Sequence, residues 1–434
     1  MARIHPFRAV YYNALIVGDL SGVICPPYDI ISPQMEQELY DRNPHNFVRI
    51  EHNRQLPQDS ATDNRYTRSA AVMQKWLEEK ALVTAEKPAV YIHDHHFTGS
   101  GRQYKRRGLS VRVGLEEWHR NIVRPHEGTL SEARSDRISL LGALKANTSP
   151  VMAMYEDKKR QIASLLDNTG VCELLFSLDG DDGERHEVWQ IAETEIITRI
   201  CGAFKDKPLY IADGHHRYES ALNYQRERLA VNPQAAADED FNFVMMTLVD
   251  IDDPGLVILP PHRLLRGLLP SKMNGLADKL DSFFDITEVP LSQPDAWQRV
   301  DTILSDKSRI RLVLFGLDGD KLQVLTLRDE AAASRMMPYF HSDIYKRMDV
   351  SVVDHVILEE LLGLSEEEEV KISYNYDRQQ AVNSVLAQEH QLAFIISPVK
   401  GKTIKDIADA GDRMPRKSTY FYPKLPSGLL INRL

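Results

Sequence analysis

The 434-residue chain has little cysteine and no long apolar run. Its three cysteines, Cys25, Cys172 and Cys201, are widely separated and form no Cys-x-x-Cys pair, which argues against a disulfide framework and predicts reduced thiols. No stretch reaches the roughly eighteen apolar residues that a membrane span needs, and the N-terminus lacks the apolar core of a signal peptide. We therefore expect a cytoplasmic protein that does not enter a membrane.

A surplus of positive charge is also missing. The formal net charge is −10 at pH 7, which disfavours a chain-wide electrostatic grip on nucleic acid but leaves room for local basic patches that hold a phosphorylated ligand. We therefore expect a small phosphorylated molecule or a nucleotide as partner, rather than nucleic acid. A homodimer is left open.

The length predicts two domains, because one hydrophobic core stops growing at about 250 to 300 residues. The polar segment 250–255 is a candidate boundary, although it could equally be a hairpin turn. This predicts an N-terminal α/β domain at residues 1–252 and a C-terminal α+β domain at residues 253–434. The tail of the second domain, residues 411–429, could return to the functional site.

Apolar periodicity predicts both helices and strands along the chain. Residues 66–82 have helical spacing, and two alternating segments flank the glycine-rich turn at 99–101 as a β-hairpin. An apolar strand at 208–212 precedes a helix at 218–229, and the second half contains a strand pair at 310–315 and 322–327. These elements predict an α/β (α+β) fold with mixed sheets.

The strongest functional signal is the turn Asp213-Gly-His-His-Arg217, where a strand passes through glycine into a helix. A helix start presents free N–H groups and a positive dipole end to an anion. Gly214 permits close backbone approach, and Arg217 can bind two phosphate oxygens. His215 or His216 can donate a hydrogen bond or carry a proton, and Asp213 could hold Mg²⁺ or accept a proton. The alternative is a structural turn in which Asp213 caps the helix and Arg217 pairs with an acid.

The segment 124–137 gathers four basic or imidazole groups and three carboxylates. Such a mixture can hold a phosphorylated substrate beside a general base. Glu127 is the preferred base because it lies in a predicted loop, and His126 beside it could act as acid or nucleophile. The expected substrate-binding residues here are Arg124, Thr129 and Arg137. The alternative is a salt-bridged loop that leads into an amphipathic helix.

Two further segments admit a functional and a structural interpretation. In the tail, Lys417, Ser418 and Thr419 could touch the phosphates of a nucleotide while an aromatic residue stacks on its base, or the tail could be a proline-bounded loop that enters an edge strand. The run His93-Asp-His-His96 suggests a metal, yet alternate residues of a strand face opposite sides. A metal site would need ligands from elsewhere, so we interpret this run as a polar sheet face.

Several motifs, taken in order, resemble the prokaryotic family of uncharacterised proteins called DUF 1015. The resemblance runs from Phe7 to the end of the chain. Family members often carry a second proline in the tail where this chain has Arg416. The family has no assigned activity, so it implies a class and not a reaction. The motifs are Pro26-Pro-Tyr-Asp29, Asn43-Pro44, Arg124-Pro-His-Glu-Gly-Thr129, Asp136-Arg137, Ala212-Asp-Gly-His-His-Arg217 and residues 414–429.

The turn Asp213–Arg217 also resembles the phosphate-binding turn of the ParB/sulfiredoxin superfamily, whose members include a nucleotide-dependent free-serine kinase. This resemblance implies a ParB/sulfiredoxin-like phosphate-binding core with a second α+β lobe, and ATP or ADP with Mg²⁺ as cofactor. We expect Tyr28 and Asp29 of the first motif to contribute to substrate binding.

The leading hypothesis is a nucleotide-dependent phosphotransferase that acts on a small hydroxyl metabolite such as serine. Residues 213–217 would bind phosphate, Glu127 would activate the hydroxyl, and Mg²⁺ at Asp213 would bridge the phosphates. One alternative is a phosphomonoester hydrolase of the phosphoserine type, with histidine as acid or nucleophile. The other is a ParB-like, nucleotide-gated binding or regulatory protein without metabolic turnover.

Overall fold

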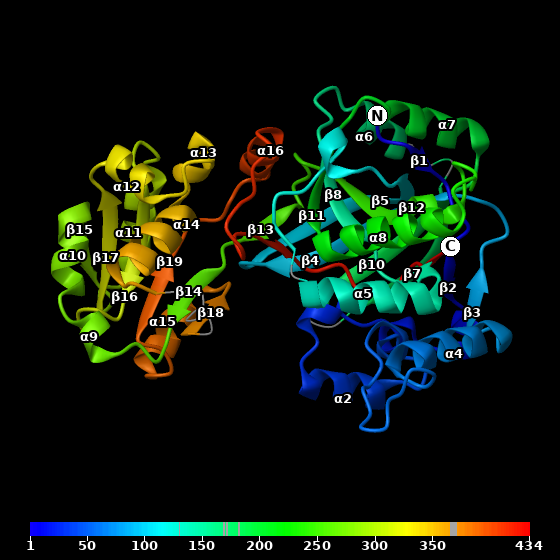
Figure 1. The fold of residues 1–434 in the computed structure, drawn as a ribbon, viewed down its shortest axis with the longest axis horizontal. Coiled ribbons are helices and arrows are strands. Elements are labelled where there is room, and N and C mark those ends of the chain that lie inside the picture. Colours follow the sequence, from blue (N-terminus) through cyan, green and yellow to red (C-terminus); the bar gives the residue numbers. More distant parts are fainter. Residues whose placement is uncertain (130, 168–169, 171, 181–182, 365–370) are drawn as a thin grey trace. The chain divides into compact units, whose positions relative to one another are not determined.

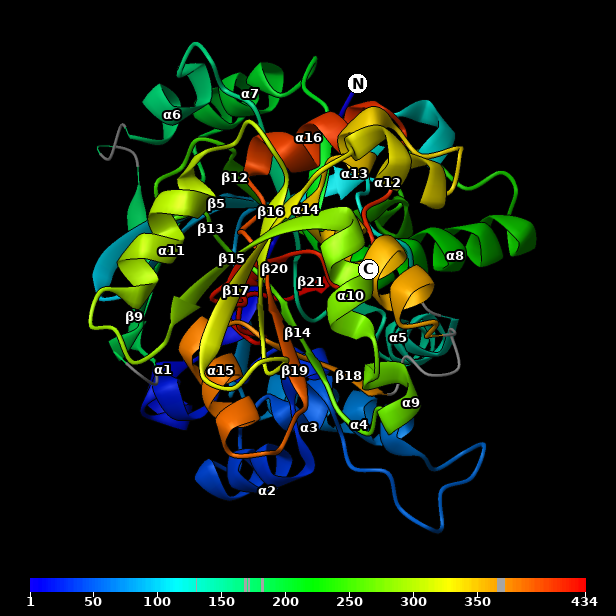
Figure 2. The same cartoon turned by 90° about the vertical axis from the view of Figure 1, so that its left-hand side faces the viewer.

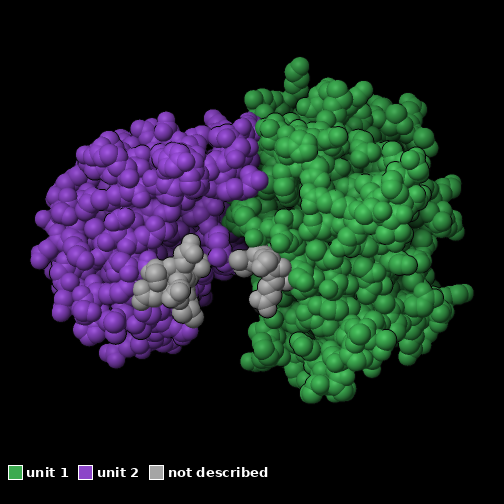
Figure 3. All heavy atoms as spheres, viewed as in Figure 1, with its two compact units in different colours: residues 1–257, 423–434 green, residues 258–422 purple. Residues whose placement is uncertain are grey.

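The computed structural model describes residues 1–129, 131–167, 170, 172–180, 183–364 and 371–434, with the backbone alone at 131–133. Two compact units make up the chain (Figures 1 and 3). Unit 1 contains residues 1–257 and 423–434, and unit 2 contains residues 258–422. The final twelve residues therefore belong to unit 1, while the predicted domains at 1–252 and 253–434 stay a prediction. Within the described ranges, no helix is long and apolar enough to cross a membrane.

Unit 1 is built around a nine-stranded sheet in the order β6-β11-β8-β12-β5-β4-β10-β9, with β1 paired to β5. The pairs β6–β11 and β8–β12 are parallel and the other pairs are antiparallel. The expected mixed sheet is thus confirmed, as is the hairpin of β4 and β5. The strands are β1 (Ile4–His5), β4 (Val90–Gly99), β5 (Arg102–Gly114), β6 (Val123–Arg124), β8 (Val151–Tyr155), β9 (Glu173–Asp179), β10 (Arg185–Ile191), β11 (Leu209–Asp213) and β12 (Phe243–Asp250).

Strand alternation gives this sheet two different faces. One face, which includes Ile211 and Ala153, packs in one core cluster with residues of α6, α7 and α8. The other face packs against both chain ends, through Phe7 and Leu430. The helices of unit 1 are α1 (Ala14–Val17), α2 (Pro33–Arg42), α3 (Val48–Glu51), α4 (Arg65–Glu78), α5 (Ser131–Leu144), α6 (Gln161–Leu166), α7 (Thr194–Ala203) and α8 (His215–Val231).

Short elements complete unit 1. The strands β2 (Val10–Tyr12) and β3 (Leu82–Thr84) form one small sheet, and β7 (Ala146–Asn147) pairs with the last strand, β21 (Asn432–Arg433). Residues 28–30 form a single 3₁₀ turn, η2. The helix predicted at 218–229 begins earlier, at His215, because Gly214 turns the chain directly from β11 into α8.

Unit 2 contains an antiparallel six-stranded sheet in the order β15-β17-β16-β19-β14-β18, which can be followed in Figure 2. The predicted strand pair at 310–315 and 322–327 is confirmed as β16 and β17. Helix α10 ends at Phe283, directly before β15 begins at Phe284. The strands of this sheet are β14 (His262–Leu265), β15 (Phe284–Pro290), β16 (Arg311–Phe315), β17 (Lys321–Leu327), β18 (Ile372–Asn375) and β19 (Leu392–Ile395). The strands β13 (Val257–Leu259) and β20 (Tyr420–Tyr422) form a separate two-stranded sheet.

The helices of unit 2 include α11 and α15, whose apolar residues form a core with those of the sheet. They are α9 (Pro270–Met273), α10 (Leu276–Phe283), α11 (Ala296–Ser305), α12 (Glu330–Met336), α13 (Asp343–Lys346), α14 (Asp349–Ser351), the π-helix η7 (Val352–Leu361), α15 (Arg378–Leu386) and α16 (Gly401–Asp409).

Candidate functional site

The turn between β11 and α8 has the backbone geometry expected of a glycine-dependent helix start. Gly214 adopts φ 90° and ψ 30°, in the left-handed region that favours glycine. A Cβ atom at this position would lie 2.8 Å from Nε of Arg217, so a larger residue would also displace that side chain. Glycine is therefore required twice, for its positive φ and for the close approach of Arg217.

Arg217 lies over this turn and is largely buried, with 11% of its side chain exposed. Its Nη1 donates to the carbonyl oxygen of Pro150 at 2.6 Å, and its Nη2 donates to Oδ2 of Asp213 at 2.5 Å. Its Nε is buried and has no hydrogen-bond partner among the described residues. The pairing of Arg217 with an acid, the structural alternative, is thus present. A guanidinium carries five N–H donors, and these two bonds use only two of them.

The carboxylate of Asp213 bonds to two cations, of which Arg217 is the first. The second cation is Lys424, whose Nζ donates to Oδ1. Burial alone would raise the pKa of Asp213, but Lys424 and Arg217 outweigh it and hold that pKa well below the ordinary value. Burial alone would lower the pKa of Lys424, but Asp213 and Asp29 outweigh it and raise that pKa above the ordinary value. Both partners are therefore charged at neutral pH.

The first predicted motif lies beside the same charges. Oδ2 of Asp29 is 3.9 Å from Nζ of Lys424, and the guanidinium of Arg137 lies over the ring of Tyr28 at 3.9 Å. Burial raises the pKa of Tyr28 to about 12, although Arg137 and Arg217 oppose the rise. Segments that are far apart in the sequence thus meet at one place within unit 1.

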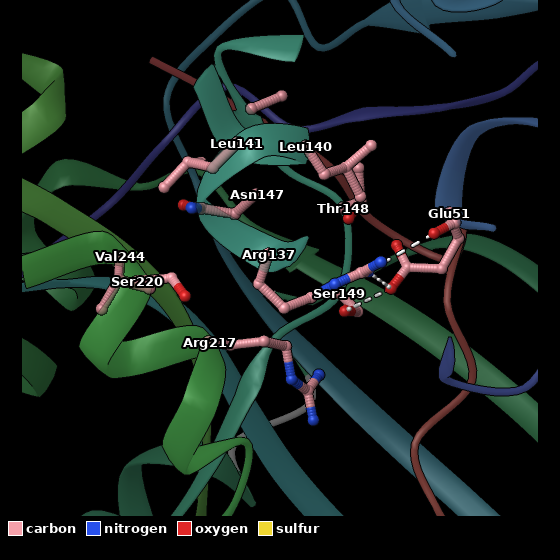
Figure 4. A pocket seen from close by; sticks show the side chains of 11 residues that line it. Glu51, Arg137, Leu140, Leu141, Asn147, Thr148, Ser149, Arg217, Ser220 and Val244 are labelled. Carbon is pink, nitrogen blue, oxygen red and sulfur yellow. Dashed lines mark hydrogen bonds and ion pairs between the residues drawn. The ribbon is translucent and has the colours of Figure 1, made fainter. Parts of the chain in front are cut away.

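Arg137 is 6% exposed and holds a buried ion pair. Its Nη1 is 3.1 Å from Oε1 of Glu51, and its Nε donates to Asp136 at 2.7 Å. Figure 4 shows Arg137 and Arg217 lining one small hollow from two helices, and there Ser149 also bonds to Glu51. This cavity measures about 40 Å³, far below the roughly 300 to 1,000 Å³ of pockets that enclose a small-molecule ligand. This hollow is therefore too small to enclose a nucleotide.

The segment 126–129 is bonded to both elements that the turn joins, β11 and α8. His126 is fully buried, its Nδ1 donates to the carbonyl oxygen of Ile211 at 2.7 Å, and its backbone N–H donates to Nε2 of His215 at 3.3 Å. Oε1 of Glu127 is 4.0 Å from Nε2 of His126. Glu127 is half-buried, as is His216 in the first turn of α8. The two predicted motifs are therefore held together by direct hydrogen bonds.

Other predicted site residues have different surroundings. Thr129 donates its hydroxyl to Glu219 of α8, which also pairs with Arg134. Arg124 donates to the carbonyl oxygen of Asn121 at 2.8 Å, at the sheet edge. The predicted phosphate contacts of Lys417, Ser418 and Thr419 stay a prediction, since these residues belong to unit 2. There Ser418 is fully buried and donates to the carbonyl oxygen of Pro415 at 2.5 Å.

The expected Mg²⁺ does not fit Asp213 as it stands. Mg²⁺ takes oxygen ligands in near-octahedral geometry and would need a carboxylate oxygen that points to open space. Both oxygens of Asp213 face cations instead, Arg217 and Lys424. We therefore assign no role in catalysis to a metal at Asp213.

Sequence reasoning assigned no role to three residues that complete this network. Lys424 was visible only as the end of the basic and aromatic tail segment, and its partner lies 211 positions away in the sequence. Glu51 sits in the short helix α3 without any motif around it, and Glu219 looks like an ordinary surface residue of α8. Only the fold places the carboxylate of Glu51 beside Arg137 and that of Glu219 beside Thr129.

The fold and the site define an α+β protein with a glycine-dependent strand-to-helix turn, over which separated charged segments converge. The family model described as "Protein of unknown function (DUF1015)" matches residues 4–351. The chain belongs to this family. None of the curated proteins matches the chain.

Among solved structures, a conserved hypothetical protein from Pyrococcus furiosus is similar with 13% identity and a TM-score of 0.36, over 74% of this chain and 95% of that chain. A free serine kinase in complex with AMP has 13% identity and a TM-score of 0.34, over 74% and 92% of the two chains. SbnI with a C-terminal truncation, from Staphylococcus aureus, has 11% identity and a TM-score of 0.33, over 73% and 90%. With TM-scores below 0.5, these structures define neither the fold nor the ligand of this chain.

Proposed function

We propose that the chain is a nucleotide-dependent phosphotransferase that acts on a small hydroxyl metabolite such as serine, with phosphate bound at the turn Asp213–Arg217. The observation that supports this most is the convergence of separated segments on the turn within unit 1. Lys424 from the tail and Arg217 from α8 share one carboxylate, and Asp29 of the first motif lies 3.9 Å from Lys424. Capping a helix does not require such a network.

The start of α8 supports an anion at the turn. This helix has 17 residues and no acidic residue in its first turn, and the first N–H groups of a helix have no partner within the helix itself. Those groups and the helix dipole both favour a phosphate oxygen near Gly214. Because glycine has no side chain, the ligand can approach the backbone itself.

The ion pair at Asp213 can open without leaving an isolated charge. Asp213 has two cationic partners, so a phosphate can take Arg217 while Lys424 continues to neutralise the carboxylate. Removing the only partner of a buried charge costs about 3 to 5 kcal/mol, and the second cation avoids most of that cost. Arg217 then forks onto two phosphate oxygens, a geometry to which its guanidinium is suited.

Glu127 is the proposed base. It takes the proton of the substrate hydroxyl while the hydroxyl oxygen attacks the terminal phosphorus of ATP. The bond between that phosphorus and the bridging oxygen breaks, and ADP leaves with the electron pair. The bond between His126 and Ile211 and the contact of His126 with His215 fix the loop that carries Glu127.

The experiment is a turnover assay with the full chain. With ATP and serine, the proposal expects ADP and phosphoserine in equal amounts, and it expects no free phosphate from phosphoserine alone. The substitution Glu127→Gln should abolish transfer while ATP still binds. Glu117→Gln, at an exposed carboxylate paired with Arg226, is the control and should leave turnover unchanged. Phosphate release from phosphoserine without nucleotide would instead identify a hydrolase. Nucleotide binding with no transfer to any hydroxyl acceptor would identify a binding protein.

A further inference from the structure

A cluster of histidines lies on the face of the unit 1 sheet that packs against the chain ends. In the strand register, His95 of β4 stands directly opposite His186 of β10 on one side and Arg106 of β5 on the other. His93 lies two residues before His95, on the same face. All three histidines are buried, with 5% or less of each residue exposed. The polar sheet face expected from residues 93–96 is therefore an enclosed imidazole cluster.

Glu184 points its carboxylate at two of these rings. Its Oε2 is 2.9 Å from Nε2 of His95 and 3.6 Å from Nε2 of His186. Ligand atoms of these three residues all lie within 4.8 Å of one another. In a tetrahedral zinc site with ligands at 2.0 to 2.2 Å, neighbouring ligand atoms are roughly 3.4 Å apart. The measured separations bracket that value, so small side-chain shifts bring all three atoms into a coordination sphere.

We propose that His95, His186 and Glu184 form a zinc site, with both imidazoles bound through Nε2 and the carboxylate as third ligand. Two histidines and one glutamate are a donor set that Zn²⁺ takes in proteins, with water in the fourth position. Glu184 is the most exposed of the three, with a quarter of its side chain accessible to solvent, so the ion and its water can enter from that side.

The surroundings of His186 are those of a metal ligand. Its Nδ1 lies 3.0 Å from Nε2 of His93. When Nε2 of His186 binds the metal, Nδ1 carries the proton and donates a hydrogen bond to Nε2 of His93. A second hydrogen bond of this kind orients metal-binding imidazoles.

Arg106 determines what must change at His95. Its Nη2 donates to Nδ1 of His95 at 3.0 Å and to the carbonyl oxygen of Pro423 at 2.9 Å. A guanidinium can only donate, so without metal the proton of His95 is on Nε2, toward Glu184. Coordination through Nε2 releases this proton to solvent, and the ring binds as an imidazolate whose Nδ1 still accepts from Nη2 of Arg106. The charge of Arg106 stays on the far side of the ring from the metal.

Zinc titration of the full, untagged and chelator-treated chain tests the site without any nucleotide, so it is independent of the proposed phosphotransfer. We expect one tightly bound Zn²⁺ per chain, and Co²⁺ in its place should give visible absorption. Glu184→Gln and His186→Ala should each weaken zinc binding at least tenfold. His96→Ala is the matched control, because His96 lies on the same strand but on the opposite face and is 39% exposed.

Circular dichroism establishes whether each variant is folded. Glu184→Gln decides the question if His186→Ala does not fold, because Glu184 is partly exposed and the substitution preserves its shape. No bound zinc in the unsubstituted chain would overturn the site. So would unchanged affinity in the folded Glu184→Gln variant, or an equal loss of affinity in His96→Ala.

Discussion

Replacement of Gly214 by alanine probes the contact on which the turn depends. Alanine in the left-handed region costs about 1 to 2 kcal/mol. Its Cβ atom would also lie 2.8 Å from Nε of Arg217, so the guanidinium must move away from Asp213. Loss of a hydrogen bond to a charged group adds about 1.5 to 3 kcal/mol. We therefore expect Gly214→Ala to lower the free energy of unfolding by about 2.5 to 5 kcal/mol in sum.

The matched control is Gly101→Ala in the β4–β5 turn of the same unit. Gly101 also has a positive φ, of 72°, but a Cβ atom there would meet nothing within 4 Å. Only the backbone cost of about 1 to 2 kcal/mol should remain. Urea unfolding followed by circular dichroism measures both variants. Equal destabilisation by the two substitutions would refute the reasoning, because it would mean that Arg217 does not lie against the turn.

Three further predictions concern buried charge and the second unit. Since the pKa of Asp213 is lowered in the folded state, its contribution to stability is complete above the unfolded pKa of about 3.9 and is lost as the pH falls through the folded pKa. In the Asp213→Asn variant, the urea midpoint should therefore fall less between pH 6 and pH 2 than it does in the unsubstituted chain. Arg137→Met leaves Glu51 buried without its cation and should cost about 3 to 5 kcal/mol in urea unfolding; a cost below about 1 kcal/mol, the usual value of a surface pair, would contradict the buried pair. Gly316→Ala would place a Cβ atom against the carbonyl oxygen of Gln391 at φ 105°, so calorimetry should show a lower melting transition for unit 2 with nucleotide binding retained; an unchanged transition would contradict this packing.

The elements of the fold could be predicted where the apolar period was clear. The β4–β5 hairpin and the strand pair β16–β17 follow directly from alternation and glycine-rich turns. The start of α8 was placed three residues too late, because polar residues 215–217 show no apolar period although they are helical. Periodicity finds the buried part of a helix and not its exposed or charged first turn.

The candidate site could be predicted as a set of motifs but not as a network. Residue types indicated that Asp213 and Arg217 belong to a functional or capping turn. The pairing of Asp213 with Lys424 depends on the chain returning from residue 423, which no local pattern encodes. The histidine cluster shows the same limit, since the strand period placed His93 and His95 on one face while their partners His186 and Glu184 come from another hairpin.

Calorimetric titration with a non-hydrolysable ATP analogue tests the central claim most directly. The account predicts that the unsubstituted chain binds the analogue and that Arg217→Ala binds it at least tenfold more weakly. Arg226→Ala, an exposed arginine on the same helix, should bind it as the unsubstituted chain does. Equal affinity of folded Arg217→Ala and unsubstituted protein, or no binding by the unsubstituted protein, would contradict a phosphate site at this turn.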